Sequence, residues 1–377
     1  MMRTHRLSLV AAIASIAVFG IGVGQSAPLL SLLLETRGTD TALNGINAAA
    51  TFAGVILGPW IAPGAVRHIG VTIFLLVCYS LDITLFLSLK AFDGVVLWFV
   101  LRFLLGLVGA NIFTVSEAWI NRLAAGERRG QIVGLYAGAL AAGFAIGPLI
   151  LSITGVFGWA PFIANAGITA VAALPLLATR SPMREFAAQQ PATLRSIIAR
   201  APLILGAVAL FGLYESALMA LLPVWGVRTG LSERVAAATV SGVYFGALAS
   251  QVPLGMVSDK LSRGTALRLC GVIGLVGAAL LPMLSATHLP LFALLFVWGG
   301  IAFGIYPIAL SMAGDRFHDA ELVAVNAALI SAYGLGALVG PVLGGIAMDM
   351  WNPHGLPVLF VVLFAGFTLA MGRRSRT

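Results

Sequence analysis

Several features of soluble enzymes and metalloproteins are scarce or missing in this chain of 377 residues. Only two cysteines occur, Cys78 and Cys270, and both lie in long apolar runs, so neither a disulfide framework nor a cysteine-rich metal site is indicated. The two lysines, Lys90 and Lys260, do not follow a glycine, which excludes a G-x-x-x-x-G-K-[ST] phosphate loop. No H-E-x-x-H or C-x-x-C motif occurs. We therefore expect no metal, no cofactor and no enzymatic activity.

Charged residues are rare as well, at 10% of the chain, whereas 60% of the residues are hydrophobic and the mean hydropathy is +1.01. A soluble globule could not cover so much apolar surface, so the chain belongs in a bilayer. Apolar runs of about 20 residues, long enough to span it, recur between short polar breaks. We expect twelve transmembrane helices, over residues 8–34, 42–64, 71–90, 95–120, 131–155, 160–179, 202–225, 235–256, 266–286, 289–313, 323–349 and 355–372.

The first apolar run follows a basic start and could also be read as a secretory signal. Its continuation to about Leu34 exceeds the apolar region of a signal peptide, which favours a first transmembrane helix.

Basic residues are distributed unevenly among the predicted loops. If the N-terminus is cytoplasmic, Arg37, Lys90, Arg228 and Arg234 fall outside, Arg102 lies within a span, and the other seventeen of the 22 basic residues fall inside. This positive-inside bias predicts an even number of spans, with both termini cytoplasmic. The net charge of +8 therefore indicates membrane orientation, and we expect no nucleic-acid partner.

Internal repeats divide the chain into two related halves. The sequence GFAIGP at 143–148 recurs as GALVGP at 336–341, an offset of 193 residues. Two more pairs, PGAVRHIG with GMVSDKLSRG and GANIFTVSEAWINR with GIYPIALSMAGDR, recur at nearly the same offset. This predicts an all-α membrane protein with two pseudo-symmetric six-helix bundles, 1–179 and 202–377, joined by a cytoplasmic linker over 180–201.

These motifs resemble those of the major facilitator superfamily. The family's loop pattern G-x-x-x-D-[KR]-x-x-[RK] occurs in the second half as Gly255, Asp259, Lys260 and Arg263. The first half departs from the pattern, since Pro63 and Arg67 occupy the glycine and aspartate positions. The resemblance implies a twelve-helix transporter in which this loop latches the cytoplasmic ends of neighbouring helices.

Helix-packing motifs extend the resemblance over nearly the whole chain. RFLLGLVGA in span four resembles the family's arginine-glycine motif. Span eleven matches the antiporter-associated pattern G-x-x-x-G-P-x-x-G-G at Gly336, Gly340, Pro341, Gly344 and Gly345, and span five keeps Gly143, Gly147 and Pro148. Glycines four apart let helix backbones approach, and a proline beside them bends the helix. SEAWINR, RRGQIVGLY, YPIAL and LVAVNAALISAY are similar to the YcaD-like branch.

A carboxylate inside a span is costly and therefore a candidate functional group. Glu215 lies about thirteen residues into span seven, near the midplane, where it could exchange a proton or neutralise a cationic cargo. The repeat is expected to place Gln25 and Ser26 of span one opposite Glu215 and Ser216. The alternative is a structural glutamate bonded to a Tyr or Ser hydroxyl on an adjacent helix.

Asp82 and Arg102 lie about ten residues on either side of the predicted turn near 91–92, and equal distances from a turn mean equal depth in antiparallel helices. We expect them to pair. The pair could be a structural neutralisation, or protonation of Asp82 could free Arg102 as a coupling switch.

Further candidates complete the predicted site. Glu117, Asn121 and Arg122, near the cytoplasmic end of span four, are expected to be gate or latch contacts. Tyrosines within spans indicate a cavity that can stack on an amphipathic cargo, although helix packing explains any one of them equally well. The expected substrate-binding residues are Gln25, Ser26, Asn111, Tyr214, Tyr244, Tyr306 and Tyr333.

Together these patterns predict a secondary transporter of the bacterial inner membrane that works by alternating access. We expect a monomer with membrane lipid, protons and a small neutral or cationic amphipathic solute as its partners, and Glu215 as the main proton-coupling group. The span-eleven motif, by resemblance, favours export. The alternatives are uptake of a small metabolite or cofactor, proton-coupled or facilitated, and a non-transporting membrane receptor.

Overall fold

Long helices make up the chain in the computed structural model, which describes residues 2–92, 94–124, 129–179, 200–285, 287–317 and 320–374. Helix satisfies every backbone polar group within its own segment, as an apolar run in a bilayer requires. Twelve of the segments are long and apolar enough to cross a membrane. The expected number of spans is therefore confirmed, and the all-α fold class with it.

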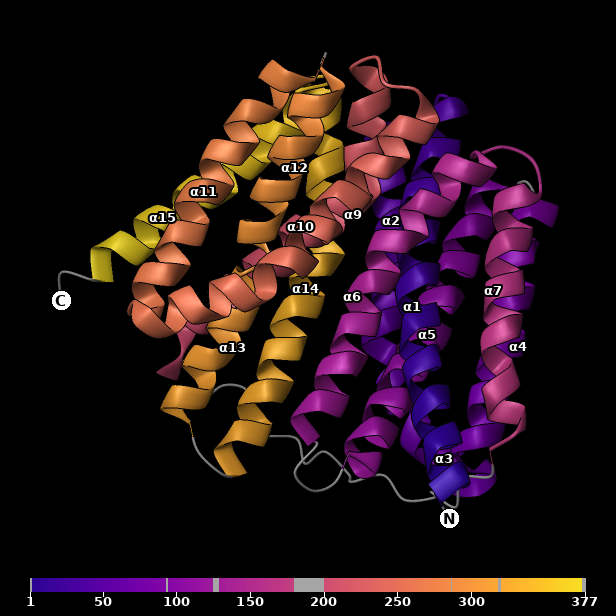
Figure 1. The fold of residues 1–377 in the computed structure, drawn as a ribbon. Coiled ribbons are helices and arrows are strands. Elements are labelled where there is room, and N and C mark those ends of the chain that lie inside the picture. Colours follow the sequence, from indigo (N-terminus) through magenta and orange to yellow (C-terminus); the bar gives the residue numbers. More distant parts are fainter. Residues whose placement is uncertain are drawn as a thin grey trace. The chain divides into compact units, whose positions relative to one another are not determined.

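The described helices form two compact units, each labelled by its helices in Figure 1. Unit 1 contains residues 1–33 and 50–188, and unit 2 contains residues 34–49 and 189–377. The predicted division into 1–179, 180–201 and 202–377 stays a prediction, and residues 180–199 of its linker lie outside the described residues.

Unit 1 is built from the first part of α1, the second part of α2 and the helices that follow them. The elements are α1 (Met2–Thr36), α2 (Thr41–Leu57), the short 3-10 helix η1 (Gly58–Trp60), α3 (Ala62–Ile69), α4 (Val71–Ala91), α5 (Val95–Leu123), α6 (Arg129–Thr154) and α7 (Ala160–Leu177). Within it α4 packs against both α5 and α7.

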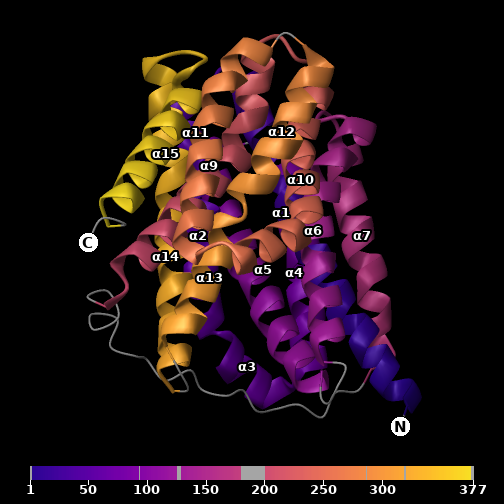
Figure 2. The same ribbon diagram turned by 60° about the vertical axis from the view of Figure 1, so that its left-hand side comes forward.

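Unit 2 is built around α9, whose side chains are buried along most of its length. The elements are α9 (Pro202–Arg228), α10 (Glu233–Lys260), α11 (Arg263–Leu284), α12 (His288–Ala302), α13 (Ile305–Arg316), α14 (Ala320–Met350) and α15 (Gly355–Arg374). The helix α14 lies along α9, and α10 with α12 and α11 with α15 form further neighbouring pairs, which Figure 2 shows from a second side.

Two predicted spans differ from the observed helices. The second span, expected to be continuous over 42–64, ends as an α-helix at Leu57 and continues as η1 and α3, where Pro59 and Pro63 remove backbone donors. The tenth span, expected over 289–313, breaks into α12 and α13 at 303–304. Pro148 and Pro341, by contrast, lie inside α6 and α14 without ending them.

Glycines at spacing four bring the first and fifth spans of unit 1 together. A side chain at Gly143 would collide with the backbone carbonyl of Ala17, and one at Gly147 with that of Ile21. The backbones of α1 and α6 can approach this closely only because neither position carries a Cβ, which is how membrane helices gain van der Waals contact without a hydrophobic driving force.

The equivalent helices of unit 2, α9 and α14, pack by the same device. A side chain at Gly336 would collide with the carbonyl of Ala209, and one at Gly340 with that of Leu213. The two units thus repeat one pattern of contacts, glycine for glycine, at the positions that the internal repeat identifies.

These matching contacts correct the register of the repeat at Glu215. Ile21 on α1 and Leu213 on α9 face equivalent glycines, so the structure places Val23, not Gln25, at the position equivalent to Glu215. A shift of two residues turns a side chain by about 200° around a helix. The expected pairing of Gln25 with Glu215 was therefore wrong, and the two side chains point to different faces of equivalent helices.

Candidate functional site

Glu215 lies in the interior of unit 2 with both of its carboxylate oxygens hydrogen-bonded. The Tyr244 hydroxyl of α10 donates to Oε1 at 2.8 Å, and the Tyr333 hydroxyl of α14 donates to Oε2 at 2.9 Å. The glutamate is 7% exposed and sits in a membrane-spanning helix that is buried along most of its length. Within the described part of the chain, no cationic side chain pairs with it.

Aromatic rings surround this carboxylate. Tyr306 lies 6.2 Å from Tyr333 between ring centroids, and Phe211 lies 5.6 Å from Tyr306. On the other side Phe303 lies 5.0 Å from Tyr244. We call these five side chains the aromatic cluster: Phe211, Tyr244, Phe303, Tyr306 and Tyr333. Tyr306 and Tyr333 are only partly buried, so the cluster has an accessible edge.

Tyr214, although adjacent in sequence to Glu215, faces a different side of α9, where its ring lies 6.0 Å from Phe303 of the aromatic cluster. Its ring is fully buried and packs 5.4 Å from Trp298, 5.1 Å from Phe360 and 5.1 Å from Phe364. Its hydroxyl has no hydrogen-bond partner among the described residues. Consecutive residues on a helix differ by about 100°, so the expected role of Tyr214 in substrate binding gives way to a packing role.

In unit 1 the amide of Gln25 is held by α7. Its Nε2 donates to the Pro161 carbonyl at 2.7 Å, and its Oε1 accepts from Asn165 Nδ2 at 3.1 Å. The neighbouring Ser26 hydroxyl donates to the Val23 carbonyl of its own helix at 3.3 Å. Asn165 was not among the residues predicted from the sequence; an amide within an apolar span was the available signal.

Asn111 of α5 is buried, and its side chain is directed back along its own helix. Its Nδ2 donates to the Leu107 carbonyl at 2.8 Å, while its Oδ1 lacks a hydrogen-bond partner among the described residues. It remains a candidate for substrate contact through that oxygen.

Asp82 and Arg102 do not pair in this structure, so that expectation was wrong. Asp82 of α4 accepts from the Thr169 hydroxyl of α7 at 3.4 Å, whereas Arg102 of α5 donates from Nη2 to the Ala27 carbonyl of α1 at 3.4 Å. Among the described residues no ion pair joins Asp82 to any cation. Equal depth fixes the height of two side chains but not the direction in which each points around its helix.

The loop motif of the second half holds three helices together through Arg263. Its Nε donates to Asp315 of α13 at 2.7 Å, and its Nη1 donates to Ser258 of α10 at 3.2 Å. Gly255 and Lys260 are exposed, and the side chain of Asp259 lies outside the description. Asp315 was not among the residues predicted from the sequence, although it is the second-last residue of the repeat motif GIYPIALSMAGDR.

Glu117, Asn121 and Arg122 are exposed on the last turns of α5. Beside them the Ser116 and Tyr136 hydroxyls hydrogen-bond at 2.9 Å and join α5 to α6. A gate or latch role for the three exposed residues stays a prediction.

An apolar groove on unit 2 is separate from the Glu215 site. It has a volume of about 540 Å³ and is lined by Gly242, Phe245, Leu248, Ala249, Phe292 and Phe296 from α10 and α12. Because no polar side chain lines it, it offers nothing that would orient a polar solute.

A sequence model described as the Major Facilitator Superfamily matches residues 7–244 and 229–375, nearly the whole chain. The chain belongs to the Major Facilitator Superfamily. It is 25% identical over 364 residues to the MFS-type transporter YfkF of Bacillus subtilis (strain 168), covering 94% of this chain and 92% of that protein. It is 23% identical over 355 residues to YcaD of Escherichia fergusonii, covering 92% and 91%. The resemblance to the YcaD-like branch is thereby confirmed.

Solved structures of transporters share the superfamily fold. The nucleoside transporter NupG aligns with a TM-score of 0.78 at 14% identity, covering 97% of each chain. A bacterial homologue of the human lysosomal transporter Spinster, solved in an inward-facing and unoccupied conformation, aligns with a TM-score of 0.74 at 15% identity, covering 98% of this chain and 97% of that one. Because it belongs to this superfamily and has twelve candidate membrane spans, the chain is a multi-pass MFS membrane transporter.

Proposed function

We propose that this MFS transporter exports a small amphipathic solute, neutral or cationic, across the inner membrane by alternating access, in exchange for protons that Glu215 takes up and releases. The observation that carries the proposal is the carboxylate of Glu215, buried in a membrane-spanning helix and bonded by two tyrosine hydroxyls. A buried ionisable group without a paired charge is expensive in a bilayer, and such groups commonly mark ion pathways.

The two tyrosines give the site a hydrogen-bonded arrangement in either protonation state. An ionised Glu215 accepts from both phenols, as observed. A protonated Glu215 has an O–H of its own, which can donate to a phenol oxygen because tyrosine both donates and accepts. The displaced phenol O–H then turns to another acceptor. Protonation thus changes the direction of a hydrogen bond between α9 and α10 or α14, which couples the proton to the packing of these helices.

The aromatic cluster supports an amphipathic or cationic cargo. Ring faces attract a cation, and flat amphipathic molecules stack on them. The carboxylate beside the rings binds either a proton or a positively charged group, and the two compete for the same oxygens. Competition of this kind couples proton entry to cargo release without a second ion site.

Arg102 is the second ionisable group that we propose takes part in the cycle. It is buried in unit 1 and donates from Nη2 to the Ala27 carbonyl of α1 at 3.4 Å, so a backbone carbonyl solvates part of its charge. Asp82, bonded to Thr169 between α4 and α7, is the proposed acid of the same unit.

Transport by the purified protein in liposomes tests the proposal. A thermal-shift screen of amphipathic cations and neutral compounds at two pH values first selects a ligand, which is then loaded as the labelled solute. We expect a pH gradient to drive its flux and Glu215→Gln to lower that flux at least tenfold. Exchange without a gradient should stay intact for a neutral solute and weaken for a cationic one, because only the cation binds the carboxylate. Glu233→Gln, which replaces the acid that begins α10, is the matched control and should retain the flux.

Three results of these experiments would contradict the proposal. Flux that ignores the pH gradient would refute proton coupling, and flux driven in the uptake direction in oriented vesicles would refute export. Ligand binding without any flux would favour a receptor.

A further inference from the structure

The connection between the second and third membrane spans contains a short helix, α3, at the end of unit 1 where α1 also begins (Figure 1). The second span runs over Thr41–Trp60 and the third begins at Val71, so α3 (Ala62–Ile69) lies between two span ends at one face of the bilayer. The positive-inside rule predicts that this face is cytoplasmic. We therefore expect α3 to lie where the inner leaflet meets water.

One side of α3 is fixed to the rest of unit 1. Ala62 and Val66, one helical turn apart, are fully buried, and α3 packs against α4 and α5. Residues four apart lie on the same side of a helix, so these two contacts set the rotation of α3 about its axis. They decide which of its residues are directed away from the protein.

The exposed residues combine apolar and basic side chains. Trp60 is 81% exposed and Ile61 is 45% exposed, and both Arg67 and His68 are exposed. Leu57, the last residue of α2, is 50% exposed, so the apolar surface of the span continues into Trp60 and Ile61. We call Trp60, Ile61, Arg67 and His68 the interfacial face. Apolar and aromatic residues beside bases are typical of helices that lie in the headgroup region of a membrane.

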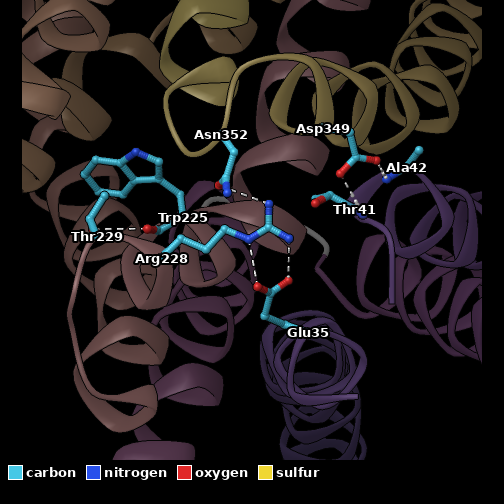
Figure 3. Close-up of polar contacts among 8 residues, drawn as sticks. All are labelled: Glu35, Thr41, Ala42, Trp225, Arg228, Thr229, Asp349 and Asn352. Atoms are coloured by element: carbon cyan, nitrogen blue, oxygen red, sulfur yellow. Dashed lines mark hydrogen bonds and ion pairs between the residues drawn. The ribbon is translucent and has the colours of Figure 1, made fainter. Parts of the chain in front are cut away.

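Charged groups at the opposite end of α2 are matched within the protein, as Figure 3 shows. Arg228 donates from Nε and Nη2 to the two carboxylate oxygens of Glu35, at 2.7 and 2.9 Å. Asp349 accepts from the backbone N–H groups of Thr41 at 3.0 Å and Ala42 at 2.7 Å, the first two residues of α2. A carboxylate at a helix N-terminus meets free N–H groups and the positive end of the helix dipole. These charges therefore have a role within the fold.

The bases of the interfacial face have no such role. Arg67 and His68 make no hydrogen bond or ion pair with the residues that the structure describes. The internal repeat also places an acid, Asp259, at the position equivalent to Arg67, in a helix α10 that continues without a break to Lys260. The reversed charge and the separate short helix thus belong to the first half alone, and an anion outside the protein is the partner that the two bases fit.

We propose that the interfacial face binds anionic phospholipids of the inner leaflet, with the Trp60 ring at the depth of the headgroups and the Arg67 guanidinium on a lipid phosphate. The planar guanidinium matches phosphate oxygens in shape, and an anionic leaflet attracts bases at its surface. The partner is a lipid and not a soluble anion, because only a lipid also covers Trp60 and Ile61. The contact depends on the predicted orientation of the chain, and it involves neither Glu215 nor a transported solute.

Quenching of tryptophan fluorescence by brominated lipid tests the proposal on the full-length protein in vesicles. The vesicles contain equal amounts of phosphatidylglycerol and phosphatidylcholine, and only one of the two lipids is brominated in each preparation, so the surface charge stays constant. The protein has seven tryptophans, and the difference between the parent and Trp60→Phe gives the quenching of Trp60. We expect brominated phosphatidylglycerol to quench Trp60 at least twice as strongly as brominated phosphatidylcholine.

Variants of Arg67 separate charge from general membrane contact. Arg67→Gln should bring the ratio of the two quenching values close to one, Arg67→Lys should keep most of it, and Arg67→Glu should reverse it. Arg37→Gln removes an exposed base beyond the other end of α1 and is the matched control, which should leave the ratio unchanged. Trp351, which is 60% exposed at the end of α14, should show no preference between the two lipids.

Three outcomes would overturn the proposal. Equal quenching of Trp60 by the two lipids would mean that the bases do not select an anionic headgroup. Quenching by a water-soluble agent but by neither lipid would mean that the interfacial face is turned to water or to a soluble partner. Inorganic phosphate, added as a competitor, should not change the ratio, and a ratio that falls to one would indicate a site for free phosphate.

Discussion

Helices α1 and α9 occupy equivalent places in the two halves but carry their polar groups on different faces. On α1 the amide of Gln25 points to α7 and is bonded there by neutral partners. On α9 the carboxylate of Glu215 points to α10 and α14 and is bonded by two phenols. The same glycine contacts hold both helices, so the difference lies in the side chains and not in the backbone scaffold.

The buried amide of α1 and the buried carboxyl group of α9 therefore have different roles. An amide whose hydrogen bonds are all neutral has one state, and it specifies which face of α1 meets α7. A carboxyl group has two states that differ by a charge, and its partners must accommodate both. We infer that duplication supplied a common packing frame, within which α9 of the second half placed an ionisable group beside an aromatic cluster.

The largest expected effect comes from breaking the shared frame. A leucine at Gly340 would meet the Leu213 carbonyl and the Ser216 hydroxyl, and backbone cannot move aside without separating α9 from α14. We expect Gly340→Leu, and equally Gly147→Leu in unit 1, to abolish folded protein in membranes. Gly255→Leu, where nothing lies within 4 Å of an added Cβ, is the control. Size-exclusion profiles of the extracted protein measure the result, and a monodisperse Gly340→Leu protein would contradict it.

Replacing the neutral amide should affect stability and not coupling. Gln25→Leu keeps the size of the side chain but leaves the Pro161 carbonyl and the Asn165 amide without their partner. We expect it to lower the free energy of unfolding by about 1–2 kcal/mol. Solute flux driven by a pH gradient should persist, in contrast to the Glu215→Gln protein. Thermal unfolding and flux are measured on the same preparation, and loss of coupling in Gln25→Leu would remove the distinction between the two helices.

The two tyrosines of the Glu215 site allow a finer test within unit 2. Tyr244 is 3% exposed, whereas Tyr333 is only partly buried. Water can replace the Tyr333 hydroxyl but cannot reach the Tyr244 position, and a hydrogen bond to a charged group contributes about 1.5–3 kcal/mol. We expect Tyr244→Phe to lower the initial rate of pH-driven flux about tenfold and Tyr333→Phe less than threefold. The reverse order would mean that Tyr333 is the partner that matters for transport.

The spans could be predicted well from the sequence because crossing a bilayer requires about 20 consecutive apolar residues, whatever the helix packs against. Span seven, expected over 202–225, is found at Pro202–Arg228, and the others agree to a similar degree. The direction of a side chain around its helix depends on long-range packing, and a two-residue error in register or an unknown rotation misplaced Gln25 and the Asp82–Arg102 pair.

The smallest expected effect concerns the ion pair between Arg263 and Asp315 in unit 2. Arg263 and Asp315 are 30% and 60% exposed, so water and salt screen their interaction. We expect Asp315→Asn to lower the free energy of unfolding by less than about 1 kcal/mol, and by less still in high salt. The comparison is with Glu35→Gln, which breaks the ion pair between Arg228 and Glu35. The side chains of that pair are 18% and 16% exposed. Thermal melts of both variants at low and high salt measure the contrast; an equal loss in both would show that burial does not distinguish these two pairs.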